Sequence, residues 1–343
     1  MSHGLLGPLM VDIAGKTLTA GDYEILRHPL VGGVILFTRN YENAAQVQAL
    51  VSAIRALREP QLLVAVDYEG GRVQRFREKG FTTLPPARAF GRLYDRDPEQ
   101  ARNMAHVCGW MIGSELRAVG VDLCFAPVLD LEAGVSTVIG DRAFHGSPEA
   151  ITDLGSALMH GLRDAGMAAT GKHFPGHGRV VEDSHESLPV DNRPLEQIRA
   201  EDMTPFRELI RQGLPSVMMA HIRFPQVDPQ PASLSRRWIQ DELRGQLGFD
   251  GAVFCDDLSM GGAAAVGGYP ERAMLALEAG CDMLPVCNNR AAVVELTDQL
   301  RATPDTIVSA RLGRLRAEPG RGLDEIQSMA AWKHARNSLS TLV

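Results

Sequence analysis

The segment KHFPGHGRVVEDSH, residues 172–185, places a lysine, three histidines and an Asp-Ser-His triplet within 14 residues. Pro175, Gly176 and Gly178 disfavour a regular helix here, because proline and glycine are the poorest helix formers. Side chains that exchange protons near neutral pH are poor core material, but they are useful beside a reacting substrate. We therefore predict a mobile loop that takes part in catalysis.

Asp183 and His185 are the part of this loop best suited to proton transfer. They are two residues apart, so both side chains point the same way if the loop is extended. A carboxylate beside an imidazole fixes its tautomer and raises its basicity, which allows general acid–base catalysis near neutral pH. A chance Asp-x-His triplet on a surface loop is the alternative. Ser184 lacks the GxSxG context of a hydrolase nucleophile, so we predict no serine triad.

Lys172, His173 and His177 suggest two other chemistries. The histidines are four residues apart, as in zinc-binding HExxH helices, but Pro175 and Gly176 separate them and HExxH is absent. We therefore predict no metal. Lys172 could form a Schiff base, as in some aldolases, or bind a substrate hydroxyl or carbonyl.

Asp256 follows an apolar run in VFCDDLSMGG and precedes a glycine-rich turn. A carboxylate at the end of a buried strand can act as a nucleophile, a general base or a metal ligand. The adjacent Asp257 is better suited to capping a helix N-terminus. We predict a role in the site for Asp256.

The segment VAVDYEGGRVQRF, residues 64–76, combines Asp67 with Arg72 and Arg75 around a Gly-Gly turn. Carboxylates and arginines on one rim can hold sugar hydroxyls through charge-assisted hydrogen bonds. A purely structural pairing of Arg72 with Glu69 is the alternative.

Short apolar runs that alternate with longer helical patterns must position these groups. Continuous apolar runs are typical of strands buried on both faces of a parallel sheet. We predict strands at residues 9–12, 33–37, 62–66, 123–126, 168–170, 216–219, 252–255 and 283–286. We predict helices at residues 44–57, 97–118, 148–165, 195–213, 237–248, 269–279 and 289–300.

Roughly eight β-α alternations favour an α/β fold with a single (β/α)8 TIM-type barrel over a doubly wound sheet. No GxGxxG follows the first strand, which weakens the dinucleotide-binding alternative. We expect one catalytic domain, residues 1–343, with C-terminal helices from about residue 303 packed on the barrel.

Catalytic groups of such a barrel lie at the carboxyl ends of its strands. Five predicted strands lead to polar residues that could meet there. Charges that merely mark strand ends are the alternative explanation. The residues are Asp67, then Asp130 with Asp141-Arg142 further along, Lys172-His173, His221 and Asp256-Asp257.

Composition restricts the partners and the compartment. A net charge of −7 and 45% hydrophobic residues argue for a globular protein that binds neither nucleic acid nor anionic membranes. Five irregularly spaced cysteines without CxxC predict free, mostly buried thiols in a reducing compartment. No apolar run is long enough to cross a membrane, and MSHGLLGPLMVDIAG lacks the basic region of a secretory signal. We expect a cytoplasmic monomer that acts on a small molecule.

These motifs together resemble the bacterial NagZ-type β-N-acetylglucosaminidases of glycoside hydrolase family 3. They occur in the family's order across nearly the whole chain, and KHFPGHG followed by DSH is highly specific. The segments that carry the resemblance are ILFTRNY (35–41), VDYEGGRVQRF (66–76), FAPVLD (125–130), GDRAFH (140–145), GKHFPGHG (171–178), DSH (183–185), GFDGAVFCDDLSM (248–260) and AGCDM (279–283).

The resemblance implies that Asp256 is the nucleophile, His185 the general acid/base and Asp183 its dyad partner. It also implies which residues bind N-acetylglucosamine: Asp67, Arg75, Arg142, Lys172 and His173. Cys255 and Tyr68 depart from the serine and glutamine usual in the family, and neither is a catalytic position.

The resemblance further implies a retaining exo-β-N-acetylglucosaminidase without metal or cofactor. Its substrate would be the cell-wall turnover product N-acetylglucosaminyl-β-1,4-anhydro-N-acetylmuramic acid, with or without its peptide. A phosphorylase of N-acetylglucosaminides and a Schiff-base aldolase using Lys172 are the alternative enzymes. A sugar-binding barrel without catalysis is a third possibility, against which Asp256, Asp183 and His185 together argue.

Overall fold

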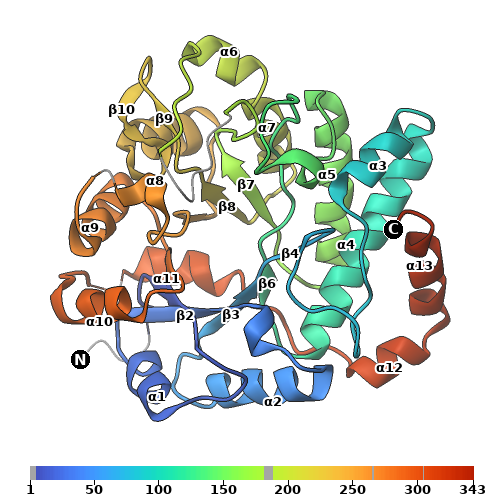
Figure 1. The fold of residues 1–343 in the computed structure, drawn as a ribbon, viewed down its shortest axis with the longest axis horizontal. Coiled ribbons are helices and arrows are strands. Elements are labelled where there is room, and N and C mark those ends of the chain that lie inside the picture. Colours follow the sequence, from blue (N-terminus) through green and yellow to red (C-terminus); the bar gives the residue numbers. More distant parts are fainter. Residues whose placement is uncertain (1–4, 181–187, 265, 304) are drawn as a thin grey trace.

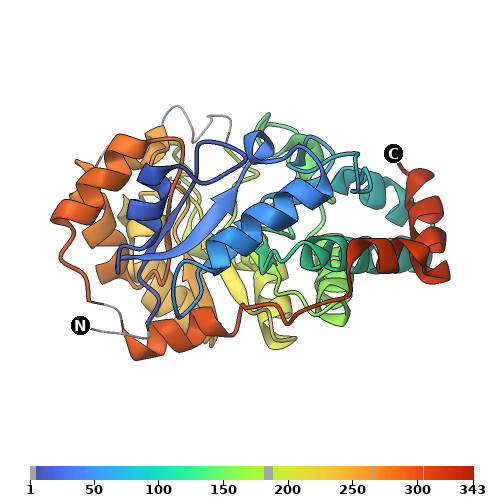
Figure 2. The same ribbon diagram turned by 90° about the horizontal axis from the view of Figure 1, so that it is seen from below.

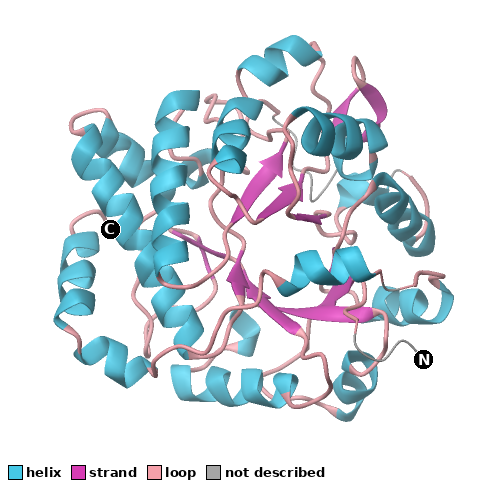
Figure 3. Cartoon of the chain, turned by 180° about the vertical axis from the view of Figure 1, so that it is seen from behind, coloured by secondary structure: helices cyan, strands magenta, loops and turns pink. Residues whose placement is uncertain are grey.

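Short parallel strands lie at the centre of the molecule and helices surround them (Figures 1 and 3). The structure, a computed structural model, describes residues 5–180, 188–264, 266–303 and 305–343. Five strands form one sheet in the order β12-β1-β2-β3-β6, and three form a second in the order β11-β8-β7. The bounds are β1 Leu9–Val11, β2 Val31–Leu36, β3 Leu63–Val66, β6 Leu123–Cys124, β7 Thr170–Phe174, β8 Ser216–Met219, β11 Ala252–Phe254 and β12 Leu284–Val286.

Isolated parallel bridges connect the two sheets. Leu123 in β6 pairs with Ala168, and Lys172 in β7 pairs with Val128. On the other side, Phe254 in β11 pairs with Met283, directly before β12. Neighbouring central strands therefore follow one another in chain order. All are buried along their full length, as their continuous apolar runs predict.

Helices cover the outside of the strands (Figure 3). They are α1 Ala20–Leu26, α2 Ala44–Arg55, α3 Ala87–Tyr94, α4 Pro98–Ala118, α5 Pro148–Asp164, α6 Leu195–Ala200, α7 Met203–Arg211, the π-helix η4 Arg237–Gln246, α8 Gly261–Ala264, α9 Tyr269–Ala279, α10 Arg290–Gln299, α11 Thr306–Gly313, α12 Leu323–Ser328 and α13 Ala330–Ser340. The connections contain the short strands β4 Tyr68–Gly70, β5 Val73–Gln74, β9 Arg223–Phe224 and β10 Asp228–Pro231, and the 3-10 turns η1 Thr38–Asn40, η2 Gly140–Arg142 and η3 Ala232–Leu234.

Three predicted elements differ from the structure. The continuous helix predicted at residues 195–213 is wrong, because α6 and α7 are separate. Glu201 leaves the helical region (φ −105°, ψ −80°), and Pro205, which lacks an N–H, is suited to the first turn of a new helix. The helix predicted at residues 237–248 is present, but residues 237–246 form a π-helix. The strand predicted at residues 168–170 is too short, since β7 continues to Phe174 and contains Lys172.

Helices α4 and α5 approach each other closely through glycines. A side chain on Gly109 of α4 would lie 2.1 Å from the Leu158 carbonyl oxygen, and one on Gly161 of α5 would lie 2.0 Å from that of His106. Both helices begin with a capped proline turn, at Asp97-Pro98 and Ser147-Pro148.

The C-terminal part of the chain covers the amino ends of the strands. Leu312 of α11 and Leu315 directly after it are buried in an inner core cluster with Met10, Leu63 and Leu123. The next helices, α12 and α13, lie together at one end of the molecule and pack against α4 (Figure 2).

Two buried carboxylates form ion pairs with arginines at these amino ends. Asp282, before β12, binds Arg244 and the α11 residue Arg311 at 2.8 and 3.3 Å. Asp122, before β6, binds Arg55 of α2 at 2.7 Å. None of the helices in the described residues combines the length and apolarity that a membrane crossing requires.

Candidate active site

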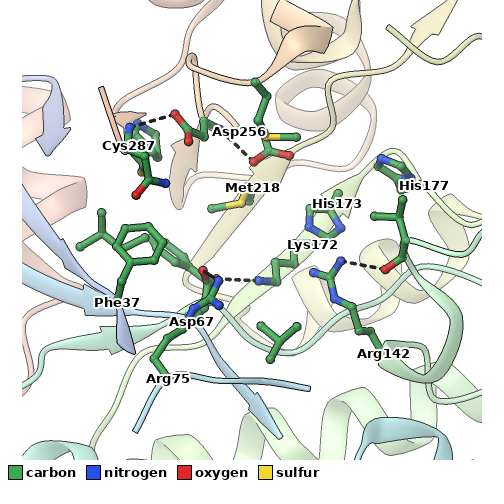
Figure 4. A pocket seen from close by; sticks show the side chains of 18 of the residues that line it. Phe37, Asp67, Arg75, Arg142, Lys172, His173, His177, Met218, Asp256 and Cys287 are labelled. Atoms are coloured by element: carbon green, nitrogen blue, oxygen red, sulfur yellow. Dashed lines mark hydrogen bonds and ion pairs between the residues drawn. The ribbon is translucent and has the colours of Figure 1, made fainter. Parts of the chain in front are cut away.

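A cavity of about 380 Å³ lies at the carboxyl ends of the central strands (Figure 4). Six of the predicted site residues line it: Asp67, Arg75, Arg142, Lys172, His173 and Asp256. They come from β3, β5, η2, β7 and β11 or the residues directly after them, which are spread between residues 63 and 256. Asp183 and His185 lie outside the described residues.

Lys172 lies at the centre of a buried ion network. Its Nζ is 2.6 Å from Oε1 of Glu69 and 3.1 Å from Oδ1 of Asp67. Glu69 also accepts two hydrogen bonds from Arg142, at 2.8 and 2.9 Å. Arg75 binds the other oxygen of Asp67 at 3.1 Å. Two carboxylates and three cations therefore hold one another in fixed positions.

The network keeps its members ionised. Burial favours the neutral form of Lys172, but attraction to Glu69 and Asp67 outweighs burial and raises the pKa of Lys172. Burial also opposes ionisation of the two carboxyls, yet Lys172 lowers the pKa of Asp67 together with Arg75, and Arg142 with Lys172 lowers the pKa of Glu69. A protonated amine has no lone pair for attack on a carbonyl. The geometry therefore disfavours a Schiff-base lysine and favours a donor to a bound hydroxyl.

Glu69→Gln is expected to destabilise the fold by about 3 kcal/mol or more, because it leaves two buried cations with one carboxylate fewer. The pKa of Glu69 is lowered in the folded protein, so its contribution is present above the unfolded pKa of about 4.3 and is lost as pH falls through the folded value. Urea unfolding at neutral pH measures the loss.

Asp141→Asn is the matched control for Glu69→Gln. Asp141 also binds an arginine, Arg72, at 3.0 Å, but both side chains are about half exposed. Removal of this charge should cost less than about 1 kcal/mol. Equal losses in the free energy of unfolding for the two substitutions would show that the burial of Glu69 adds nothing to the stability of its ion pairs.

His173 is oriented by Asp130, a fully buried carboxylate that follows β6. His173 Nδ1 lies 2.7 Å from Oδ2 of Asp130, while Oδ1 accepts the backbone N–H groups of His173 and His177 at 3.1 and 2.8 Å. The carboxylate thus fixes both the imidazole and the backbone that follows it. Burial and the neighbouring His173 lower the pKa of His177 to about 4, so His177 is neutral at neutral pH.

Asp256 lies in the turn after β11, where its Oδ1 accepts the N–H of Asp257 at 2.8 Å. The carboxylate of Asp257 accepts the N–H groups of Ser259 and Cys287, at 2.9 and 3.0 Å. The prediction that Asp257 caps a helix is wrong, since α8 begins only at Gly261 and the carboxylate instead links the turn to the end of β12. Burial raises the pKa of Asp257 to about 6.

Glu69 and Asp130 belong to the site. Asp130 is predicted from the sequence only as a polar residue beyond a strand end, and Glu69 only as an alternative structural partner of Arg72. The alternative pairing of Arg72 with Glu69 is wrong, because Glu69 binds Arg142. The signal for Glu69 was its position two residues after Asp67, since alternate side chains of an extended segment lie on one face. The signal for Asp130 was its position beyond a strand end.

Comparison with known proteins gives a family for this arrangement. The model of the glycosyl hydrolase family 3 N-terminal domain matches residues 9–315. A β-hexosaminidase from Thioalkalivibrio sulfidiphilus is 51% identical over 337 residues, which cover 98% of this chain and 96% of the relative.

Solved structures agree with the family match. The fold is similar to that of NagZ from Neisseria gonorrhoeae in complex with N-trifluoroacetyl-D-glucosamine, with a TM-score of 0.94, 42% identity and coverage of 100% of this chain and 99% of the other. The complex of that NagZ with a zinc ion has a TM-score of 0.92, 41% identity and the same coverage. The chain therefore belongs to glycosyl hydrolase family 3, among the relatives of its NagZ-type β-N-acetylhexosaminidases.

Proposed function

We propose that the chain is a retaining exo-β-N-acetylglucosaminidase that removes terminal N-acetylglucosamine. The observation that carries the proposal is that Asp256 shares one cavity with the ionised network of Asp67, Lys172 and Arg142. Fixed charges bind sugar hydroxyls well, and a carboxylate beside them can attack an anomeric carbon. The similarity to β-hexosaminidases and to a NagZ bound to an N-acylated glucosamine supports this substrate class.

We propose that the two sheets are arcs of one (β/α)8 barrel. The parallel bridges at Leu123–Ala168, Val128–Lys172 and Phe254–Met283 support closure at both junctions. The barrel and the helices from about residue 303 would then form one catalytic domain, residues 1–343.

In the proposed mechanism, Asp256 attacks the anomeric carbon and forms a covalent glycosyl-enzyme. His185, oriented by Asp183, protonates the departing oxygen and then removes a proton from the attacking water. Most retaining glycosidases use a second carboxyl group about 5–5.5 Å from the nucleophile for this step. Here an imidazole replaces that acid, and Glu182 and Glu186 are the alternative proton donors in the sequence.

The proposed sugar-binding groups are Asp67, Arg75, Arg142, Lys172 and His173. Phe125 and Met218 line the cavity and also belong to the inner core cluster, so packed apolar side chains close its inner end. A cavity closed at one end admits the end of a glycan rather than its middle. This supports removal of a terminal residue.

We propose a cell-wall turnover product as the natural substrate, N-acetylglucosaminyl-β-1,4-anhydro-N-acetylmuramic acid with or without its peptide. The family resemblance supports this choice. Recycling of this product is consistent with a cytoplasmic monomer whose five cysteines are free and buried.

Hydrolysis is expected to persist in the presence of a metal chelator, because Asp256 and His185 supply the nucleophile and the proton without a Lewis acid. Among the described residues, no three His, Cys, Asp or Glu side chains are grouped as metal ligands. Initial rates before and after dialysis against EDTA check this. Loss of activity that zinc restores would contradict the prediction.

The stereochemistry of the product tests the proposed function. An aryl N-acetyl-β-glucosaminide is followed by proton NMR, and the first sugar released should be the β-anomer, because two displacements retain configuration. The α-anomer as first product would overturn the double displacement. Repeating the reaction in phosphate distinguishes the phosphorylase alternative, which would yield N-acetylglucosamine 1-phosphate.

A further inference from the structure

The turn that carries Asp256 is attached to the strands on both sides of β11. On the β12 side the carboxylate of Asp257 accepts the N–H of Cys287. On the β8 side the carbonyl oxygen of Asp257 lies 2.9 Å from Nε2 of His221. We propose that His221 is a positioning residue that fixes the direction of the Asp256 carboxylate through Asp257. This inference rests on the proposed role of Asp256 as nucleophile.

The hydrogen bonds of His221 define its tautomer. A carbonyl oxygen can only accept, so Nε2 carries the proton that is donated to Asp257. Nδ1 lies 2.6 Å from Oγ of Ser233, which then donates its hydroxyl proton to the neutral ring. Both side chains are fully buried, and burial lowers the pKa of His221, which keeps the ring neutral.

The backbone of Asp257 transmits this contact to Asp256. Its N–H donates to Oδ1 of Asp256, and its C=O accepts from His221 and from the N–H of Met260 at 3.0 Å. The carbonyl and the N–H of Asp257 belong to two successive peptide planes that meet at its Cα. Loss of the donor from His221 would let the backbone shift at Asp257 and so redirect the N–H that orients the carboxylate. An attacking atom displaced by about 1 Å can slow a reaction about 100-fold.

Two substitutions separate the two sides of the imidazole. In His221→Gln the amide nitrogen reaches as far along the side chain as Nε2 and can donate to Asp257. In His221→Asn the shorter amide reaches only the position of Nδ1, so the contact with Ser233 can remain while the one with Asp257 is lost. The pair therefore tests the donor to Asp257 with a matched polar control.

The measurement is covalent labelling of the full-length protein with 5-fluoro-β-N-acetylglucosaminyl fluoride. A carboxylate oxygen of Asp256 bonds to the anomeric carbon, the carbon–fluorine bond breaks and fluoride leaves. Mass spectrometry gives the labelling rate and the final labelled fraction. We expect His221→Asn to label about 10- to 100-fold more slowly than wild type, with the same final fraction and unchanged reagent affinity. His221→Gln should label at close to the wild-type rate.

Three results would overturn the inference. They are labelling of His221→Asn at the wild-type rate, equal slowing of both variants, and a lower labelled fraction at an unchanged rate, which indicates a purely structural role. If His221→Asn does not fold, Ser233→Ala takes its place: it removes the hydroxyl that holds Nδ1, lets the ring turn away from Asp257 and should also slow labelling. Absence of label on Asp256 in the wild type would instead overturn the nucleophile assignment.

Discussion

Asp256→Ala is expected to lower kcat for an aryl N-acetyl-β-glucosaminide by at least about 10⁴-fold. The carboxylate forms the bond to the anomeric carbon and offsets positive charge in the oxocarbenium-like transition state, and alanine does neither. Initial rates with folded variant protein, verified by circular dichroism, give the measurement. Substrate affinity should change far less, because the ionised network around Lys172 is untouched.

Sodium azide is the control for this loss. A small anion can occupy the space vacated by the carboxylate and attack the same face of the sugar. Asp256→Ala should then form N-acetylglucosaminyl azide with the α configuration when the leaving group is good. A variant that keeps a tenth of the wild-type rate, or that azide does not rescue, contradicts the nucleophile role.

His185→Ala is expected to lower kcat/KM about 10²- to 10⁴-fold for the natural disaccharide but much less for a dinitrophenyl glycoside. A sugar alkoxide departs only when it is protonated, whereas a dinitrophenolate departs without a proton. The two kcat/KM ratios to wild type, measured with the same protein preparation, give the comparison.

His177→Asn is the matched histidine control. His177 lines the same cavity but is neutral at neutral pH, since burial and His173 lower its pKa to about 4. Any decrease in kcat/KM caused by this substitution should be equal for the two substrates. Equal losses for His185→Ala would remove the acid role, and Glu182→Gln and Glu186→Gln would then identify a carboxylic acid instead.

Much of the site follows from one rule applied to the sequence. Asp67, Lys172 and Asp256 are predicted at strand ends, and parallel neighbouring strands bring their carboxyl ends to one edge. The cavity confirms that these side chains meet. Their catalytic and binding roles come from the family resemblance and await the experiments above.

The contacts of these residues could not be predicted in the same way, although the strand-end rule also predicts Asp130. Glu69 and Asp130 act through contacts with Arg142 and with the backbone of His177, which depend on where separate loops fold back. Local patterns do not define such contacts. The end of α6 at Glu201 could not be predicted either, because the helical period of the apolar residues continues across it.

Leu312 and Leu315 complete the inner apolar cluster at the amino ends of the strands, and they are synthesised after all of the strands. A growing chain has made all of the central strands once residue 286 is joined, yet their inner apolar cluster still lacks these two leucines. The ribosome must add nearly thirty more residues, and release them from its exit tunnel, before the interior is closed to water. The pocket at the opposite end of the strands rests on that same interior, because Phe125 and Met218 belong to both. We therefore expect the pocket to reach its final packing only after translation has passed the last strand.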